Sequence, residues 1–253
     1  MIPKIIHLCW LSGDAYPPKI AKCLETWKRH LPDYDVMLWD TKRFDLNTSV
    51  WVRQAFEKRK YAFAADYIRF YALYHYGGIY LDSDVEVLRS FDDLLDLPYF
   101  IGAEKAQTPE AAIMGAVKGC DWIKKCLDYY EDRPFIKADG TLDILTVPDI
   151  MIHQIEQLRP IRVLTLEESL NIRQLDMQRE VLEFNDAFFS PKVFDSREVE
   201  ITPYTYAIHH YQNSWFSPKA KAYYRARAYL VKLLGHKTVR RLETTLMPWK
   251  FKK

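Results

Sequence analysis

The sequence predicts an α/β protein with a mostly parallel sheet and a basic helical tail. Short apolar runs flanked by turn residues alternate with helical patterns, one such run ends in two acidic residues, and the final segment is strongly basic. Alternation of strands and helices is typical of a mostly parallel sheet. With 253 residues, 49% of them apolar, the chain can form one large domain with a substantial core.

The first elements have the order strand, helix, strand. Residues 4–10 form a mostly apolar run, which predicts a strand. Apolar residues then recur at helical spacing from Ile20 to Trp27, and residues 36–39 predict a second strand that ends at Asp40. This spacing is typical of the βαβ unit of a nucleotide-binding sheet.

A long helix and an acidic strand end follow. Residues 61–76 carry apolar side chains at helical spacing, and Gly77-Gly78 provides a stop. The buried run 79–81 then leads directly into Asp82 and Asp84. Because ligands of open α/β sheets bind beyond the carboxyl ends of strands, we expect the chemistry here.

The later elements are less regular. Residues 99–102 and 112–114 predict short strands, residues 122–130 a helix, and residues 205–209 a late strand. The stretch 134–199 mixes helical and extended patterns without a clear period. No internal repeat or low-complexity segment accompanies it.

The C-terminal segment differs from the rest in charge. Residues 218–253 contain 11 Lys or Arg against one acid, for a net charge of +10, whereas residues 1–217 carry about −8. We therefore divide the chain into a large α/β domain, residues 1–217, and a basic tail, residues 218–253. The tail carries an apolar stripe at helical spacing, formed by Tyr223, Ala226, Leu230, Leu233 and Leu234.

A basic amphipathic helix of this kind predicts an anionic membrane surface as partner. The alternative, that the tail packs on the domain with its lysines in solvent, stays open. No recognised nucleic-acid-binding motif accompanies the basic residues, so we expect no nucleic-acid partner.

The cysteines and the N-terminus favour a cytoplasmic protein, peripheral at the inner face of the membrane. Cys9, Cys23, Cys120 and Cys126 lack the spacing of a zinc site or a disulfide framework and are expected to be reduced thiols. The chain opens on a strand pattern rather than a signal peptide, and no run of 18 apolar residues occurs.

Asp82 and Asp84 are the leading candidates for chemistry. In an extended segment their side chains project from the same face. Two adjacent carboxylates require a cation to neutralise them, and such oxygen ligands suit Mg²⁺ or Mn²⁺ shared with substrate phosphates. An isolated Asp-x-Asp is more often a solvated turn, so the surrounding residues decide between the two interpretations.

Asp66 and Arg69 share one face of the preceding helix. From residue 64 to residue 84 the chain reads A-A-D-Y-I-R-F-Y-A-L-Y-H-Y-G-G-I-Y-L-D-S-D. This segment resembles the glycosyltransferases with a D-x-D motif that are usually numbered family 32. Residues 2–10, I-P-K-I-I-H-L-C-W, are similar to the first strand of that family, and residues 209–215, H-H-Y-Q-N-S-W, to its late metal-site motif.

The resemblance implies a GT-A type Rossmann-like domain, retention of the sugar's α-configuration and a divalent cation, Mn²⁺ or Mg²⁺. It implies transfer of a hexose from a nucleotide sugar to a glycan or lipid-linked glycan acceptor, as in synthesis of bacterial capsule or lipopolysaccharide. UDP-linked hexoses are common in bacterial members and GDP-mannose in fungal ones. The chain lacks a signal peptide, so we expect the bacterial kind with UDP-glucose or UDP-galactose.

The resemblance also implies roles for individual residues. Asp84 would bind the metal, Asp82 would hold ribose or sugar hydroxyls, and Asp66 with Arg69 would grip the transferred sugar. The cation and Arg69 would stabilise the charge that develops on the leaving diphosphate. Asp66 and Arg69 alone would otherwise indicate an intrahelical ion pair. The expected donor-binding residues are Leu8, Cys9, Trp10, Asp66, Arg69, Tyr80, Asp82, Ser83, Ser214 and Trp215.

Trp10 is expected to stack on the nucleotide base, with a core position as the alternative. His209 and His210 join Asp82 and Asp84 as candidate metal ligands. Adjacent strand residues point to opposite faces, so only one histidine can face the metal, and the sequence leaves open which one.

Glu104 and Asp149 are candidates for the acceptor side. Residues 147–149, V-P-D, are similar to a family segment there, although Val147 replaces the usual glycine.

Two other functions stay open. A glycoside hydrolase also uses two acids, but its carboxyl groups flank the scissile bond about 5–9.5 Å apart. A non-catalytic metal or nucleotide-sugar-binding module would require the D-S-D segment but would not explain Asp66 and Arg69. Metal-dependent cleavage of a nucleotide sugar would separate a transferase from both alternatives.

Overall fold

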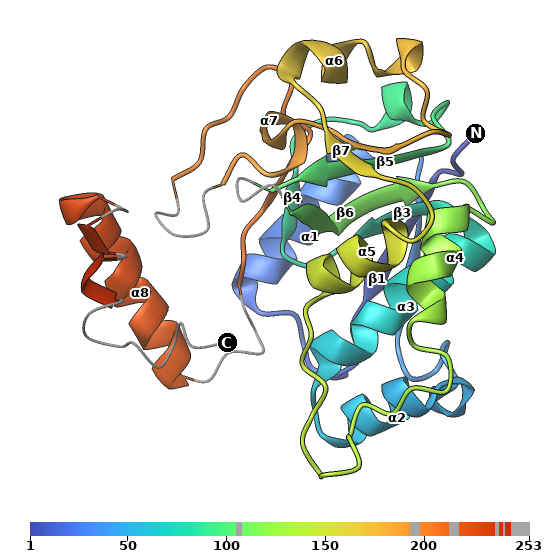
Figure 1. Ribbon diagram of the computed structural model, residues 1–253, viewed down its shortest axis with the longest axis vertical. Coiled ribbons are helices and arrows are strands. Elements are labelled where there is room, and N and C mark those ends of the chain that lie inside the picture. The colour runs from blue at the N-terminus through green and yellow to red at the C-terminus, as the bar shows by residue number, and fades with distance from the viewer. Residues whose placement is uncertain (105–107, 193–197, 213–217, 236–237, 240, 244–253) are drawn as a thin grey trace.

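The computed structural model describes residues 1–104, 108–192, 198–212, 218–235, 238–239 and 241–243 (Figure 1). A five-stranded sheet with the order β2-β1-β3-β6-β5 forms the centre of the molecule. Its strands are β1 (Ile5–Cys9), β2 (Asp35–Trp39), β3 (Gly78–Leu81), β5 (Tyr99–Ala103) and β6 (Pro109–Ala116).

Most strands of this sheet point the same way. β1 pairs in parallel with β2 and β3, whereas β6 is antiparallel to both β3 and β5. Beyond β5 the sheet continues into β8 (Val181–Glu183), because Phe184 N donates to Ile101 O at 2.8 Å and Ala103 N to Phe184 O at 2.9 Å. β7 (Ile161–Val163) pairs in parallel with β8. The carboxyl ends of all these strands except β6 therefore lie at one edge.

The helices cover the sheet and complete the expected α/β fold. α3 (Tyr61–Tyr76) contacts β1, β3 and β6, and α4 (Asp121–Asp128) packs against both α3 and α5 (Val147–Ile155) (Figure 1). α2 (Val50–Glu57) packs on α3. The other elements are α1 (Pro18–His30), β4 (Val85–Val87), α6 (Leu166–Leu170), α7 (Asp186–Phe189) and β9 (Ala207–His209).

The predicted elements are present, several of them with shifted ends. β6 is longer at both ends than the predicted strand 112–114. α4 ends at Asp128 rather than at residue 130. The late strand begins at Ala207 rather than at residue 205, because Thr205 belongs to a turn: its hydroxyl accepts from Thr202 N and donates to Ala187 O. In the irregular stretch 134–199 the described residues form short elements, each too brief for a period to appear.

Gly77 and Gly78 connect α3 to β3 and fix where the acidic strand end lies. Their φ angles are +67° and +103°, which only glycine adopts without strain. A Cβ on Gly78 would lie 2.6 Å from Ile5 O, so the glycine also allows β3 to approach β1. The buried His7 imidazole contacts Gly77 O at 2.7 Å and holds the turn.

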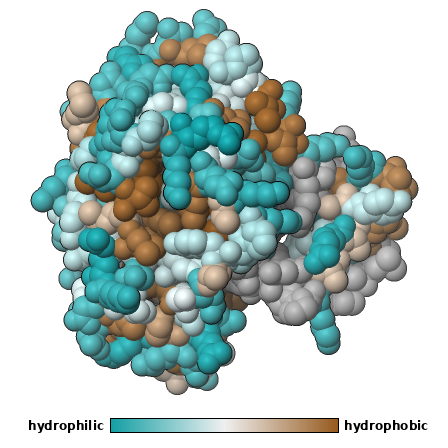
Figure 2. Space-filling model, turned by 180° about the vertical axis from the view of Figure 1, so that it is seen from behind, coloured by the Kyte–Doolittle hydropathy of each residue, from teal (hydrophilic) through white to brown (hydrophobic). Residues whose placement is uncertain are grey.

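α8 (Pro218–Leu234) stands apart from the sheet and its covering helices (Figure 1). It buries Ala228 and Val231 but exposes Tyr229 (66%), Leu230 (41%) and Leu233 (60%). Apolar and hydrophilic residues lie side by side on the surface of this segment (Figure 2). The predicted amphipathic helix is thus present, and much of its apolar stripe faces solvent.

All four cysteines are free thiols, as expected from their spacing. Among the helices of the described residues, none has the length and hydrophobicity needed to cross a bilayer.

Glu183 is a buried acid without a partner in the described part of the chain. It is 1% exposed, neither carboxylate oxygen has a hydrogen-bond partner there, and burial raises its pKa to about 8 from 4.5. Between these two values the folded protein holds a proton that the unfolded chain has released. The free energy of unfolding must therefore fall as the pH rises from about 4.5 to about 8.

We expect Glu183→Gln to flatten this pH dependence. The free energy of unfolding of the variant, relative to that of the wild type, should be higher at pH 8 than at pH 5. Urea denaturation of both proteins at the two pH values measures the effect. The neutral-to-neutral control Gln178→Asn, in a nearby exposed turn, should keep the wild-type pH dependence. An unchanged pH dependence in Glu183→Gln would show that Glu183 ionises normally in the folded protein.

Candidate active site

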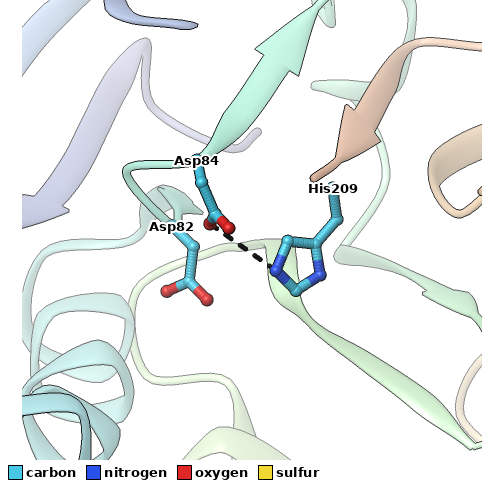
Figure 3. Close-up of side chains that lie close together, drawn as sticks. All are labelled: Asp82, Asp84 and His209. Carbon is cyan, nitrogen blue, oxygen red and sulfur yellow. Dashed lines mark ion pairs between the residues drawn. The ribbon is translucent and has the colours of Figure 1, made fainter. Parts of the chain in front are cut away.

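The acidic segment forms a sharp turn at the carboxyl end of β3. Asp82 N donates to Ala112 O at 2.9 Å, and Val85 N donates to Asp82 O at 3.0 Å. The first bond keeps Asp82 in line with β3, and the second reverses the chain into β4. Asp82 and Asp84 therefore project toward the same space from the two sides of the turn (Figure 3).

β9 brings His209 to this turn from more than a hundred residues away. β4 and β9 are antiparallel with Val85 opposite His209, and His210 N donates to Asp84 O at 3.1 Å. His209 Nε2 lies 3.6 Å from Asp84 Oδ1 (Figure 3). Asp82, Asp84 and His209 each offer a ligand atom within 4.8 Å of the others.

These donors fit a divalent cation of the Mn²⁺ or Mg²⁺ type. Two carboxylates and an imidazole supply the oxygen and nitrogen ligands that such ions accept. Asp84 is only 8% exposed, and its Oδ2 accepts from Gln212 N at 2.7 Å, which orients Oδ1 toward His209. A cation held by these residues would relieve the crowding of the two carboxylates.

Carboxylates at both ring nitrogens of His209 favour the protonated form of its imidazole when no cation is bound. Burial lowers the pKa of its imidazole, but the carboxylates of Glu110 and Asp84 outweigh burial and raise that pKa to about 10. Metal ligation requires neutral imidazole, so an ion at this site would take the place of the proton on Nε2. The site thus holds positive charge at the same point in either state.

His210 points away from the cluster. Its Nε2 lies 2.7 Å from Glu86 Oε2, and its carbonyl accepts from Lys192 Nζ. Of the two candidate histidines, His209 is therefore the one beside Asp84.

Asp66 and Arg69 join the cluster through Asp82. Arg69 Nη2 lies 2.9 Å from Asp66 Oδ1 and 3.5 Å from Asp82 Oδ1, and Nη1 donates to Ala111 O at 2.6 Å. Tyr80 OH donates to the same Asp82 oxygen at 2.7 Å, and the Arg69 guanidinium lies 4.7 Å from the centre of the Tyr80 ring. The intrahelical ion pair is real, but it is one part of a network that reaches the acidic turn.

The charges of this network are buried. Asp66 and Arg69 are 8% and 6% exposed. Burial raises the pKa of Asp66 to about 7 against the opposing effect of Arg69. Burial would lower the pKa of Arg69, but Tyr80, Asp82 and Asp66 outweigh burial and raise that pKa. A fixed cationic group thus lies beside the turn in a site from which water is largely excluded.

Residues 17–101 match the family described as "Glycosyltransferase sugar-binding region containing DXD motif". This part of the chain is therefore similar to the DXD glycosyltransferases. The matched residues include Asp66, Arg69, Asp82 and Asp84, whereas His209 lies outside them.

Curated relatives resemble part of the chain. It is 33% identical over 122 residues to inositol phosphoceramide mannosyltransferase 3 of Schizosaccharomyces pombe, covering 47% of this chain and 34% of the relative. It is 33% identical over 154 residues to mannosyl phosphorylinositol ceramide synthase SUR1 of Saccharomyces cerevisiae, covering 56% and 39%. The chain thus spans little more than a third of the length of these relatives.

Among solved structures, the PaToxG glycosyltransferase superposes with a TM-score of 0.46 at 21% identity. This superposition covers 68% of this chain and 74% of that one.

Of the other predicted donor-binding residues, Cys9, Trp10 and Ser83 lie at or just beyond the carboxyl ends of β1 and β3. Trp10 is half-buried just beyond β1; its indole donates to Asp14 O, and its ring lies 4.9 Å from that of Tyr16. Cys9 lies near Tyr80 and Asp82, whereas Leu8 packs in the core at 3% exposure. Ser83 is half-buried within the DXD turn. Ser214 and Trp215 lie outside the described residues.

The two acceptor candidates occupy different elements. Glu104 follows β5, its N donates to Thr108 O at 2.7 Å, and burial together with Glu110 raises its pKa to about 8. Asp149 lies in the first turn of α5, where its carboxylate accepts from the Thr146 hydroxyl at 2.5 Å. Asp149 thus has a local structural role as a helix-terminal acceptor.

Glu110 was missed by sequence reasoning. It lies 1% exposed in β6, and its carboxylate contacts His209, Ser190 and Tyr211. A single acid within the apolar run P-E-A-A-I-M-G-A was the available indication, because an acid is rarely buried without partners.

Proposed function

We propose that this chain is a DXD glycosyltransferase, and that it is a metal-dependent hexosyltransferase of GT-A type that retains the sugar's α-configuration. Its donor would be a nucleotide sugar, and its acceptor a glycan or a lipid-linked glycan. The observation that carries this proposal is the convergence of Asp82, Asp84 and His209 at a strand end, with Arg69 connected to the same turn.

Asp84 and His209 would hold the cation. Asp82 would lie beside the cation and face the hydroxyls of the donor. The cation would neutralise the diphosphate and so make it a better leaving group. Arg69 would stabilise the charge that grows on the departing oxygen, because its guanidinium is already fixed by Ala111 O, Asp66 and Tyr80. A preorganised cation of this kind needs no reorientation during the reaction.

The remaining predicted residues have proposed places around this centre. Trp10, with Cys9 behind it, would form the wall against which the base stacks. Asp66 would hold Arg69 and accept from a hydroxyl of the transferred sugar. Glu104, at the carboxyl end of β5, would face the acceptor.

A hydrolase is less well supported by the same geometry. Both oxygens of Asp84 are engaged, one by Gln212 N and the other by His209, so this carboxylate is not free to act as a nucleophile or acid. A binding module without turnover would need no buried arginine at the leaving-group side.

The donor and acceptor follow from chemistry and from the relatives. We propose a UDP-linked hexose, with a GDP-linked mannose as the competing donor because the relatives are named mannosyltransferases. A lipid-linked acceptor, as in bacterial surface polysaccharide synthesis, agrees with relatives whose names contain a ceramide lipid.

Turnover of nucleotide sugars tests this function. UDP-glucose, UDP-galactose, GDP-mannose and a CMP-linked sugar would each be incubated with Mn²⁺, with Mg²⁺ and with a chelator. Nucleotide release and the melting temperature would be followed, since a bound donor stabilises the folded protein. Release of one nucleotide only with metal supports the transferase. Release with the chelator, or binding without release, contradicts it.

The tail, residues 218–253, is proposed to dock the domain, residues 1–217, on the anionic cytoplasmic face of a membrane. Leu230 and Leu233 are exposed on α8, and Arg225 and Lys232 of the same helix are also exposed. Basic residues near such a membrane contribute about 1 kcal/mol each. A lipid-linked acceptor would make this docking useful.

We expect the double variant Leu230→Ser, Leu233→Ser to bind phosphatidylserine-containing vesicles about tenfold more weakly in co-sedimentation, while metal-dependent donor hydrolysis persists. The matched control Leu158→Ser, Leu166→Ser changes two exposed leucines on the main body and should bind as the wild type does. Deletion of residues 219–253 should remove vesicle binding altogether. Equal binding by the double variant and the wild type, or loss of folding after the deletion, would favour packing of the tail on the domain.

A further inference from the structure

His209 has a second carboxylate partner on the side opposite the acidic turn. Its Nδ1 lies 3.2 Å from Glu110 Oε1, whereas its Nε2 faces Asp84 at 3.6 Å. The two ring nitrogens are therefore divided between a structural carboxylate on β6 and a candidate metal-binding carboxylate at the start of β4.

We propose that Glu110 is a positioning residue that fixes the tautomer and orientation of His209 for cation binding. This inference rests on the proposed metal-dependent function and adds to it a residue outside the DXD motif. With Glu110 accepting from Nδ1–H, the lone pair of neutral His209 lies on Nε2 and points at the space shared with Asp84 and Asp82. A carboxylate behind a ligating histidine also increases the basicity of the imidazole.

The surroundings hold Glu110 in one position. Oε1 accepts from Ala112 N at 3.1 Å, and Oε2 accepts from the hydroxyls of Ser190 and Tyr211. These partners come from β6, from the residue after α7 and from the segment after β9. Because the side chain is 1% exposed, water does not compete for these bonds.

Packing fixes the ring from a second direction. The rings of His209 and Tyr211 lie 4.1 Å apart, and the Tyr211 hydroxyl is 3.3 Å from the same Glu110. Rotation of His209 about its side-chain torsions would break the bond to Glu110 and lose the contact with Tyr211. The imidazole is therefore held with Nε2 toward the acidic turn before any ion arrives.

Glu110 could instead serve only to join β6, α7 and β9, and stability alone would not distinguish the two roles. The affinity for Mn²⁺ and the tautomer of His209 do distinguish them. Loss of a carboxylate behind a metal-binding histidine typically weakens metal affinity about 10–100-fold. A purely structural carboxylate would leave the affinity of the folded variant unchanged.

The experiment measures Mn²⁺ binding to the full chain by electron paramagnetic resonance, with no nucleotide present. We expect Glu110→Gln, which keeps the size of the side chain, to bind Mn²⁺ at least about tenfold more weakly than the wild type. The matched control Ser190→Ala removes one donor to Glu110 but leaves the bond to His209, and should bind within about threefold of the wild type. For the Zn²⁺-loaded wild type, long-range ¹H–¹⁵N spectra should show His209 only as the tautomer protonated at Nδ1. In Glu110→Gln this tautomer should no longer be the only one.

Asp84→Asn distinguishes failure of the metal site from failure of the role of Glu110. If the wild type binds Mn²⁺ and Asp84→Asn does not, the metal site stands, and unchanged affinity in folded Glu110→Gln then overturns the role of Glu110 alone. If Asp84→Asn binds Mn²⁺ as the wild type does, the metal site itself is wrong. A Glu110→Gln protein that fails to fold would be replaced by Glu110→Asp, for which a shortened side chain predicts the same weakening.

Discussion

Asp84→Asn is expected to lower the rate of sugar transfer by about 10³-fold or more and to remove the metal dependence of donor binding. Asparagine keeps the shape of the side chain but lacks the charge that balances a divalent cation. The loss acts on the transition state, where the charge of the leaving diphosphate is greatest. Initial rates of nucleotide release against Mn²⁺ concentration would measure both effects.

The Asp84→Asn protein must fold normally for a loss of activity to test the metal site. The Asp84 carboxylate also accepts from Gln212 N, and an asparagine oxygen can still accept that bond. The melting temperature should therefore change little. Asp35→Asn, which changes an exposed carboxylate at the start of β2, is the control and should keep full activity. Wild-type rates in a normally folded Asp84→Asn protein would remove the metal site from the mechanism.

Arg69→Lys is expected to lower kcat/KM by about 10²-fold or more, although the charge is retained. The guanidinium bonds to Ala111 O, to Asp66 and to Asp82 while lying over the Tyr80 ring. A lysine ammonium is a single compact donor and cannot reproduce this planar arrangement. Steady-state kinetics with varied donor would show whether the loss lies in kcat, as expected for an interaction made mainly in the transition state.

The control for this variant is Arg159→Lys. Arg159 makes a bidentate ion pair with Asp121 at the start of α4, away from the DXD turn. The Arg159→Lys variant should lose an ion pair similar to that of Arg69 but keep wild-type kinetics. Full turnover by Arg69→Lys would mean that Arg69 serves only as the ion-pair partner of Asp66.

The sequence alone was sufficient for the elements that bring Asp66, Arg69 and Asp82 together. The helix over residues 61–76, the glycine pair after it and the strand that ends in Asp82 lie close together in the chain, so local periodicity and turn chemistry define them. Arg69 is three residues from Asp66 and thirteen from Asp82, which places all three at one strand end once the helix reverses. Resemblance to the family added their roles.

The tertiary structure decided which histidine belongs to the site and what lies behind it. No local pattern distinguishes His209 from His210, because alternation in a strand only requires that the two point oppositely. The antiparallel register of β4 with β9, with Val85 opposite His209, turns one imidazole toward Asp84 and the other toward Glu86. Glu110 reaches His209 across 99 residues, and such a contact depends on how β6 packs beneath β9 rather than on the sequence around either residue.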